Sequence, residues 1–173
     1  MIIIGAAVVL LVLLNRPAPS TTDTGAAIIE GDAFDGITQV DPPRALQEFT
    51  LTDQRGEPFS LSDLRGKMAL LFFGFTHCPD VCPLTLLEFK QVKSALGEQA
   101  GDVAFVFISI DGARDTPEKL AEYVGGFDES FIGLTGDDAT LTRLGSDYNL
   151  YFARRADPNG SADDYIMDHT SSA

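Results

Sequence analysis

Two apolar segments, residues 68–75 and 102–111, constrain the fold of this 173-residue chain more than any other feature. Each is too short for a typical helix and too continuously apolar for a half-exposed strand, so both are predicted to be buried central strands. Between them, residues 83–96 carry leucine and valine at rough helical spacing, which predicts an amphipathic helix. A strand, a helical crossover and a second strand are typical of a parallel pair in an α/β domain.

The segments on either side extend this alternation of strands and helices. Residues 46–61 form two short alternating runs around the turn sequence DQRGEP, which predicts a hairpin. Thr116 is a suitable N-cap and Pro117 a suitable first residue for a further helix. The other expected elements are a strand at 131–136, a helix at 137–149 and a closing hairpin of residues 150–156 and 164–170. We therefore expect one α/β domain, with a central mixed β-sheet flanked by helices.

The first 44 residues differ in composition from the rest of the chain. Residues 1–14 are apolar throughout, and residues 15–44 are rich in Pro, Thr, Ser, Ala, Gly and Asp without sustained periodicity. We expect an N-terminal membrane anchor at 1–14, a flexible linker at 15–44 and a folded domain at 45–173. A secretory segment is the alternative for 1–14, but no clean small-residue cleavage site follows it. Both interpretations place the domain on the exported side of a membrane.

The charge of the chain argues against nucleic acid as a partner. Twelve Lys and Arg stand against 26 Asp and Glu, a formal net charge of −14, and no run of basic residues occurs. Phosphate backbones are bound by clustered cations, which this sequence lacks.

The only two cysteines lie in the segment FTHCPDVCPLT, where a proline follows each of them directly. Cys78 and Cys82 come where the first buried strand ends and its helix begins, and sites in α/β sheets are built at that edge. We expect a turn over a helix that begins near Pro83, whose N-terminus would favour thiolates. Such a pair suits reversible disulfide exchange or the binding of a soft metal ion. A merely stabilising disulfide is less suitable, because the loop it would close is small.

Two thiolates alone make a poor metal site, and the chain has only two histidines to supply a third donor. His77 precedes Cys78 directly, so its side chain should point away from that thiol and serve in packing or hydrogen bonding. His169 lies in the last predicted strand, and a closing hairpin would bring it over the cysteine loop. A site of Cys78, Cys82 and His169 suits Cu(I) or, with another ligand, Cu(II) or Zn²⁺.

The stretches FFGFTHCPDVCPLT and FISIDGARDTPEKLAEYV, followed late by DHT, resemble the Sco/SenC family of copper-binding assembly proteins. The resemblance runs from about Phe49 to the last residue. It implies a thioredoxin-like fold and copper bound by Cys78, Cys82 and His169. It further implies delivery of copper to the CuA site of cytochrome c oxidase subunit II, or reduction of that site's thiols. The family's domain is tethered by an N-terminal membrane helix and faces the bacterial periplasm or the mitochondrial intermembrane space.

Two features of this sequence depart from the pattern of the family. Gly112 stands where the family more often has proline, and only a local change of the loop is expected. Family members usually continue with another strand and helix beyond the point where this chain stops, four residues after His169, so a truncated C-terminus is expected.

Asp111, near the predicted site, is expected to make a loop hydrogen bond rather than tune the site. Asp168 is expected to face away from the site. Residues 114–118 are assigned only the structural role of starting a helix.

Three functional hypotheses follow from these residues and the resemblance. In the first, the chain is a non-enzymatic copper metallochaperone that serves subunit II or another copper-handling protein. In the second, it is a thiol–disulfide oxidoreductase that uses Cys78 and Cys82 on a partner's cysteines. In the third, it senses copper or redox state and signals through a partner. His169 separates the first two hypotheses, because copper binding requires it and disulfide exchange does not.

Overall fold

The computed structural model describes residues 43, 45–157, 160 and 165–170. The predicted anchor at 1–14 lies outside the described residues, as does all of the predicted linker except residue 43. Among the residues that are described, no helix is long and apolar enough to cross a membrane. The described residues from Ala45 onward belong to one compact unit.

A five-stranded sheet forms the centre of this unit, in the order β2-β1-β5-β4-β3. Strands β3 (Met68–Gly74), β4 (Val103–Ser109) and β5 (Ile132–Thr135) are parallel, and β1 (Thr50–Asp53) and β2 (Pro58–Ser60) add an antiparallel hairpin. The mixed sheet and the two buried strands predicted from the apolar segments are confirmed.

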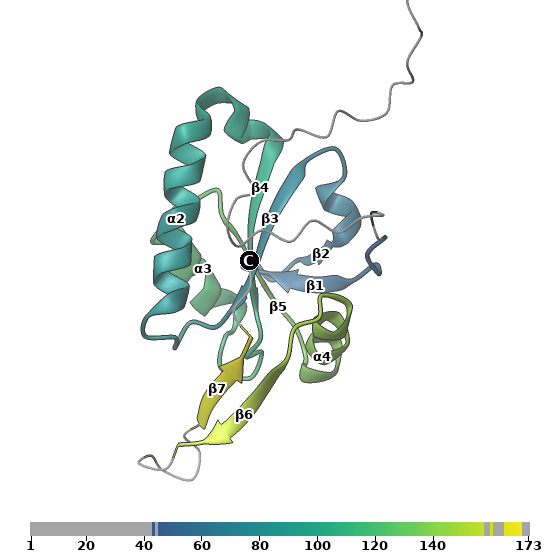
Figure 1. Ribbon diagram of the computed structural model, residues 1–173, viewed down its shortest axis with the longest axis vertical. Helices are drawn as coiled ribbons and strands as arrows, with labels where there is room; N and C mark the ends of the chain where they lie inside the picture. Colours follow the sequence, from purple (N-terminus) through teal and green to yellow (C-terminus); the bar gives the residue numbers. More distant parts are fainter. Residues whose placement is uncertain (1–42, 44, 158–159, 161–164, 171–173) are drawn as a thin grey trace, which may run out of the picture. The chain divides into compact units, whose positions relative to one another are not determined.

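In the described part of the chain, three α-helices flank the sheet, with α2 (Val81–Leu96) and α3 (Pro117–Gly125) on one side and α4 (Asp138–Asp147) on the other (Figure 1). Phe72 and Phe73, which are adjacent in β3, show which helices cover each face of the sheet, because successive side chains of a strand point to opposite sides. The Phe72 ring lies 6.5 Å from that of Phe89 in α2, whereas the Phe73 ring lies 5.2 Å from that of Tyr148, just after α4. Short 3-10 helices precede β3 (Leu61–Leu64) and follow α2 (Gly97–Asp102).

The last two strands form a separate two-stranded sheet at the bottom of Figure 1. Strands β6 (Phe152–Ala156) and β7 (Tyr165–His169) pair antiparallel, with Phe152 opposite His169. The predicted closing hairpin is confirmed. His169 therefore lies at the end of the hairpin where β6 begins, and no ladder of backbone hydrogen bonds joins these two strands to the five-stranded sheet.

The prediction that the helix after the cysteines begins near Pro83 is wrong by two residues. Helix α2 begins at Val81, so Cys82 lies within its first turn and only Cys78 precedes it. A proline at the third helical position is tolerated because the first N–H groups of a helix have no intrahelical partner. That tolerance prevails over the preference of a residue before proline for extended backbone.

Candidate metal centre

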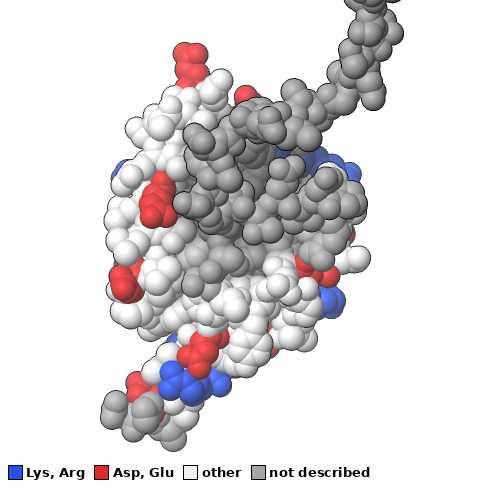
Figure 2. Space-filling view, viewed as in Figure 1, with Lys and Arg blue, Asp and Glu red and all other residues white. Residues whose placement is uncertain are grey.

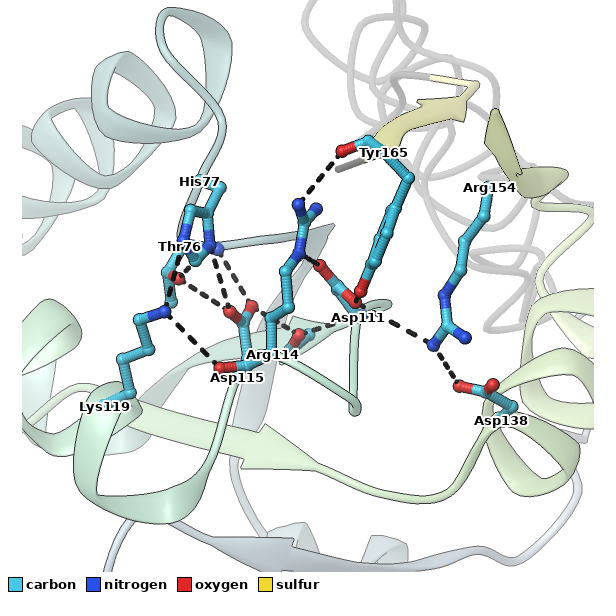
Figure 3. Close-up of polar contacts among 10 residues, drawn as sticks. Thr76, His77, Asp111, Arg114, Asp115, Lys119, Asp138, Arg154 and Tyr165 are labelled. Atoms are coloured by element: carbon cyan, nitrogen blue, oxygen red, sulfur yellow. Dashed lines mark hydrogen bonds and ion pairs between the residues drawn. The ribbon is translucent and has the colours of Figure 1, made fainter. Parts of the chain in front are cut away.

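The cysteine loop leaves the end of β3 and is tied to the neighbouring strand by a buried carboxylate. Asp115 is fully buried, and its two oxygens accept hydrogen bonds from the Thr76 N–H (2.9 Å), the Thr76 hydroxyl (2.6 Å) and the Ser109 hydroxyl (2.7 Å). Figure 3 shows Thr76 and Asp115 facing each other across this contact. The start of the loop is therefore fixed to β4 and to the segment before α3.

The two cysteines are close together but differ in exposure. Both are free thiols, with Cys78 half-buried and Cys82 fully buried. The Cys82 N–H donates to Cys78 Sγ at 3.4 Å, and the Cys78 N–H donates to the Phe75 carbonyl at 3.2 Å in the turn that leads into α2. Cys78 thus lies at the N-terminus of α2 as predicted, with Cys82 in the first turn of the helix.

This placement shifts the pKa values of the two thiols in opposite directions. Partial burial opposes ionisation of Cys78, but hydrogen bonds from the Asp80 N–H, the Cys82 thiol and two further N–H groups outweigh it and lower its pKa. Burial raises the pKa of the Cys82 thiol to about 12. Cys78 is therefore the thiolate that forms first and the one that solvent can reach.

We expect alkylation to distinguish the two thiols. In the reduced chain near neutral pH, iodoacetamide should modify Cys78 much faster than Cys82, because the thiolate is the reactive species. The rate at Cys78 should rise with pH to a midpoint below that of an ordinary thiol, since its pKa is lowered. Peptide mass spectrometry at a series of pH values measures both rates, and equal labelling of the two cysteines would contradict the structure.

Glycine at position 74, near the end of β3, permits the close approach of the buried cysteine. A Cβ atom at this position would lie 2.8 Å from Cys82 Sγ and 2.9 Å from the rings of Phe72 and Phe107. The side chain of Cys82 therefore packs directly against the backbone of the strand.

Replacing Gly74 with alanine should lower the free energy of unfolding by about 1–3 kcal/mol, because it overpacks a filled core. Gly125 in α3 is a matched control, since a Cβ atom there meets no atom within 4 Å. Gly125→Ala should be neutral or slightly stabilising, by up to about 1 kcal/mol. Urea unfolding followed by circular dichroism measures both, and equal stabilities for the two variants would show that the strand has room at position 74.

His169 packs near the loop, against the residue that accepts the Cys78 N–H. Its ring centroid lies 5.8 Å from that of Phe75, with the two rings nearly perpendicular. Its Nδ1 lies 3.0 Å from the Thr170 carbonyl oxygen, which can only accept a hydrogen bond, so Nδ1 carries the proton. That bond leaves Nε2 as the nitrogen with a free lone pair for a metal ion.

The three candidate donors are not gathered into a closed site in the structure. Among the described residues, no group of three His, Cys, Asp or Glu side chains is close enough to hold a metal ion. Cys78 and Cys82 lie close together, as the sequence predicted. His169 lies beside Phe75 rather than at the thiols. Closing a three-donor site requires a movement of the β6–β7 hairpin or of the loop.

The other histidine faces α3. Its Nε2 lies 3.2 Å from Lys119 Nζ and its Nδ1 lies 3.3 Å from Thr76 Oγ1 (Figure 3). His77 therefore takes part in hydrogen bonding, which is the role expected for it from the sequence.

Arg114 and Asp115 were expected only to start a helix, and that prediction is too narrow. Thr116 does cap α3 through the Lys119 N–H, but Arg114 bonds the side chain of Asp111 and Asp115 bonds Thr76 in the cysteine loop. Asp111 is fully buried and also accepts from the Tyr165 hydroxyl of β7, so it does more than close its own loop. The signal that could have found them is their position after β4, at the same sheet edge as the cysteines.

On the part of the face in Figure 2 that is not grey, basic side chains appear in small separate groups, some of them beside acidic ones. Asp168 is exposed and forms an ion pair with Arg155, with Arg155 Nε 2.8 Å from Asp168 Oδ2. It faces away from the buried side of β7, as its place between Met167 and His169 predicts.

Comparison with known proteins places this arrangement in a family. The sequence matches SCO1/SenC over residues 38–173. The chain belongs to the SCO1/SenC family. A SCO2-like protein of Rickettsia felis is 40% identical over 126 residues, which cover 72% of this chain and 60% of that protein. The chain thus spans about 60% of the length of this relative.

Solved structures of relatives agree with the fold. ScoI of Bradyrhizobium japonicum, solved with copper bound, is 41% identical with a TM-score of 0.68, over 74% of this chain and 80% of that one. Yeast Sco1, also solved with copper bound, is 33% identical with a TM-score of 0.64, over 74% and 71% of the two chains. The fold of this SCO1/SenC chain is thioredoxin-like, as the resemblance implied.

Proposed function

We propose that this SCO1/SenC chain is a copper metallochaperone that helps to assemble the CuA centre of cytochrome c oxidase. In this proposal Cys78 and Cys82 bind Cu(I) as thiolates and His169 supplies the third donor. The observation that carries it is the pair of adjacent free thiols at the carboxyl end of β3. Two relatives solved with copper bound support copper as the cargo.

The chemistry of the donors suits a carrier rather than a permanent metal site. Cu(I) prefers soft thiolates, and imidazole nitrogen is an acceptable third ligand. Cys78 is partly exposed, so a partner's thiolate can approach the ion from its side, while buried Cys82 retains it until exchange is complete. Copper then passes by successive ligand replacement and without a change of oxidation state. Subunit II of the oxidase, or another copper-handling protein, would receive it.

The location of the chain belongs to the same proposal. The apolar segment 1–14 and the polar segment 15–44 suit a domain tethered to a membrane and exported from the cytoplasm. A bacterial periplasm, or a mitochondrial intermembrane space in a eukaryote, would contain both the domain and the copper centre it serves.

A thiol–disulfide oxidoreductase is the second candidate, favoured by the lowered pKa of the accessible Cys78. The Cys78 thiolate would attack a partner disulfide and release one partner thiolate. Cys82 would then attack the mixed disulfide and release the second, leaving Cys78 and Cys82 oxidised and the partner reduced. Burial, the main cause of the raised pKa of the Cys82 thiol, opposes this second step, because it disfavours the thiolate that must attack.

An anaerobic Cu(I) titration of the reduced domain, residues 45–173, tests the proposal against a competing chelator. We expect one tight equivalent, and a loss of affinity of about ten- to a hundredfold in His169→Ala, as one of three ligands is removed. His77→Ala is the matched control and should bind like the unmodified domain, because His77 contacts Thr76 and Lys119. Weak binding that is indifferent to His169 would exclude the chaperone function and favour disulfide exchange.

A further inference from the structure

The β6–β7 hairpin carries His169, yet it shares no backbone ladder with the five-stranded sheet. A two-stranded hairpin has little stability of its own in water, so side chains must fix where it lies. The position of the third donor relative to the cysteines therefore depends on the contacts that hold this hairpin.

One cluster of polar contacts holds the start of β7 to the end of β4. Arg114 Nε and the Tyr165 hydroxyl each donate to a different oxygen of the fully buried Asp111. Arg114 also donates from Nη1 to the Tyr165 carbonyl at 3.0 Å. Tyr165 is thus bound at both its side chain and its backbone by residues of the β4–α3 segment.

Two guanidinium groups enclose the ring of the same tyrosine (Figure 3). The Arg114 Cζ lies 3.7 Å from the ring centroid, and the Arg154 Cζ lies 5.1 Å from it, both within the range of cation–π attraction. Arg154 comes from β6 and also pairs with Asp138 of α4 at 2.7 Å, with Asp111 Oδ1 3.8 Å away. The cluster therefore connects both strands of the hairpin to the main sheet and to α4.

His169 lies on the same strand as Tyr165, so the contacts of Tyr165 also fix the position of His169. Tyr165, Met167 and His169 alternate along β7, so their side chains share one face, and Met167 is buried on that face. His169 comes four positions after Tyr165 along the strand, a span of about 13 Å. A rotation or slip of the strand at Tyr165 would therefore displace the imidazole from its place against Phe75.

We propose that Asp111, Arg114 and Tyr165 are positioning residues that dock the β6–β7 hairpin and so set where His169 stands relative to Cys78 and Cys82. The consequence for copper rests on the function proposed above, while the docking itself does not. The hydrogen bonds of these three residues within the cluster join them to one another and not to a thiol, so their effect on the metal passes through His169.

The docking is tested first without metal, by NMR of the two histidine rings in the reduced domain. The variants are Tyr165→Phe, which removes only the hydroxyl, and Arg114→Gln, which removes the guanidinium. Both should shift or broaden the His169 ring signals, since the ring leaves the field of Phe75, and should leave the His77 signals unchanged. Arg155→Gln is the matched control, because it breaks an exposed ion pair on the outer face of the same hairpin. It should leave the His169 ring against Phe75 and therefore shift the His169 signals much less than the two test variants do.

The second readout is Cu(I) affinity in a double-mutant cycle. Tyr165→Phe and Arg114→Gln should each weaken binding by about tenfold, as is usual when the orientation of a metal ligand is disturbed. In the His169→Ala background neither should weaken it further, whereas an unrelated loss of stability would add to the effect. Tyr165→Phe keeps the ring and both cation–π contacts, so it remains informative if Arg114→Gln unfolds the domain.

The outcomes separate the two proposals. Unchanged His169 signals in both folded variants would overturn the docking proposal whatever the copper result. Shifted His169 signals together with copper binding that is indifferent to His169→Ala would sustain the docking and overturn the proposed function. A copper loss in Tyr165→Phe that persists in the His169→Ala background would show that the cluster acts on the cysteines instead.

Discussion

Replacing Cys82 with serine is expected to weaken Cu(I) binding by on the order of a thousandfold or more, about 4 kcal/mol of binding free energy. Serine keeps the size of the side chain but replaces a soft sulfur donor with a neutral hydroxyl that Cu(I) binds poorly. The loss should equal or exceed that in Cys78→Ser, because Cys82 is buried and no water can reach its place as a substitute ligand. Chelator competition under anaerobic conditions measures both affinities.

The stability of each serine variant is the control for this comparison. Cys82 is fully buried against Gly74 and the core, so Cys82→Ser also places a hydroxyl in apolar surroundings and should lower the free energy of unfolding by about 1–3 kcal/mol. Cys78 is half-buried in the loop, and Cys78→Ser should change stability little. A Cys82→Ser domain that is folded and still binds Cu(I) as tightly as the unmodified domain would rule out the two-thiolate site.

Most of the fold could be predicted because the apolar segments are long enough to identify the strands. Residues 68–75 and 102–111 contain no polar alternation, which leaves buried parallel strands as the consistent interpretation, and Thr116 with Pro117 marks the start of α3 correctly. The predicted start of α2 was two residues too late. The preference for extended backbone before Pro83 concerns only Cys82, whereas the unpaired N–H groups of the first turn and the packing of Cys82 in the core favour a helix that already begins at Val81.

The candidate site was predictable in its residues and less so in its geometry. Cys78 and Cys82 are close in sequence, so their proximity follows from the loop itself. The position of His169 depends on side-chain contacts between residues 111, 114 and 165, and such distant pairs leave no local pattern. Asp115 is a similar case, because the bond partner that matters to the loop, Thr76, lies 39 residues earlier.

Replacing Asp115 with alanine should cause the second large effect, a loss of about 2–5 kcal/mol in the free energy of unfolding. The buried carboxylate accepts from the Thr76 N–H, the Thr76 hydroxyl and the Ser109 hydroxyl. Alanine would leave the Thr76 N–H and the Ser109 hydroxyl without their acceptor, whereas the Thr76 hydroxyl keeps His77 Nδ1 within 3.3 Å. Each unpaired buried donor costs about 1–3 kcal/mol, part of which relaxation and water recover. The chain contains no tryptophan, so far-UV circular dichroism in urea is the suitable measurement.

Two further variants locate the effect in this hydrogen-bonded group. Asp115→Asn keeps the shape and one acceptor oxygen but directs an amide donor at another donor. Its free energy of unfolding should therefore lie between that of the unmodified chain and that of Asp115→Ala. Ser109→Ala removes one donor to Asp115 and also the acceptor of the buried Asp111 N–H, so it should cost less than Asp115→Ala but more than the loss of one donor alone. Hydrogen exchange at the Thr76 amide reports the loop directly, because its protection depends on Asp115 Oδ2. A stable Asp115→Ala domain with a protected Thr76 amide would show that another group holds the start of the cysteine loop. Loss of both the stability and the protection of the Thr76 amide would identify Asp115 as the residue that secures the cysteine loop to the sheet.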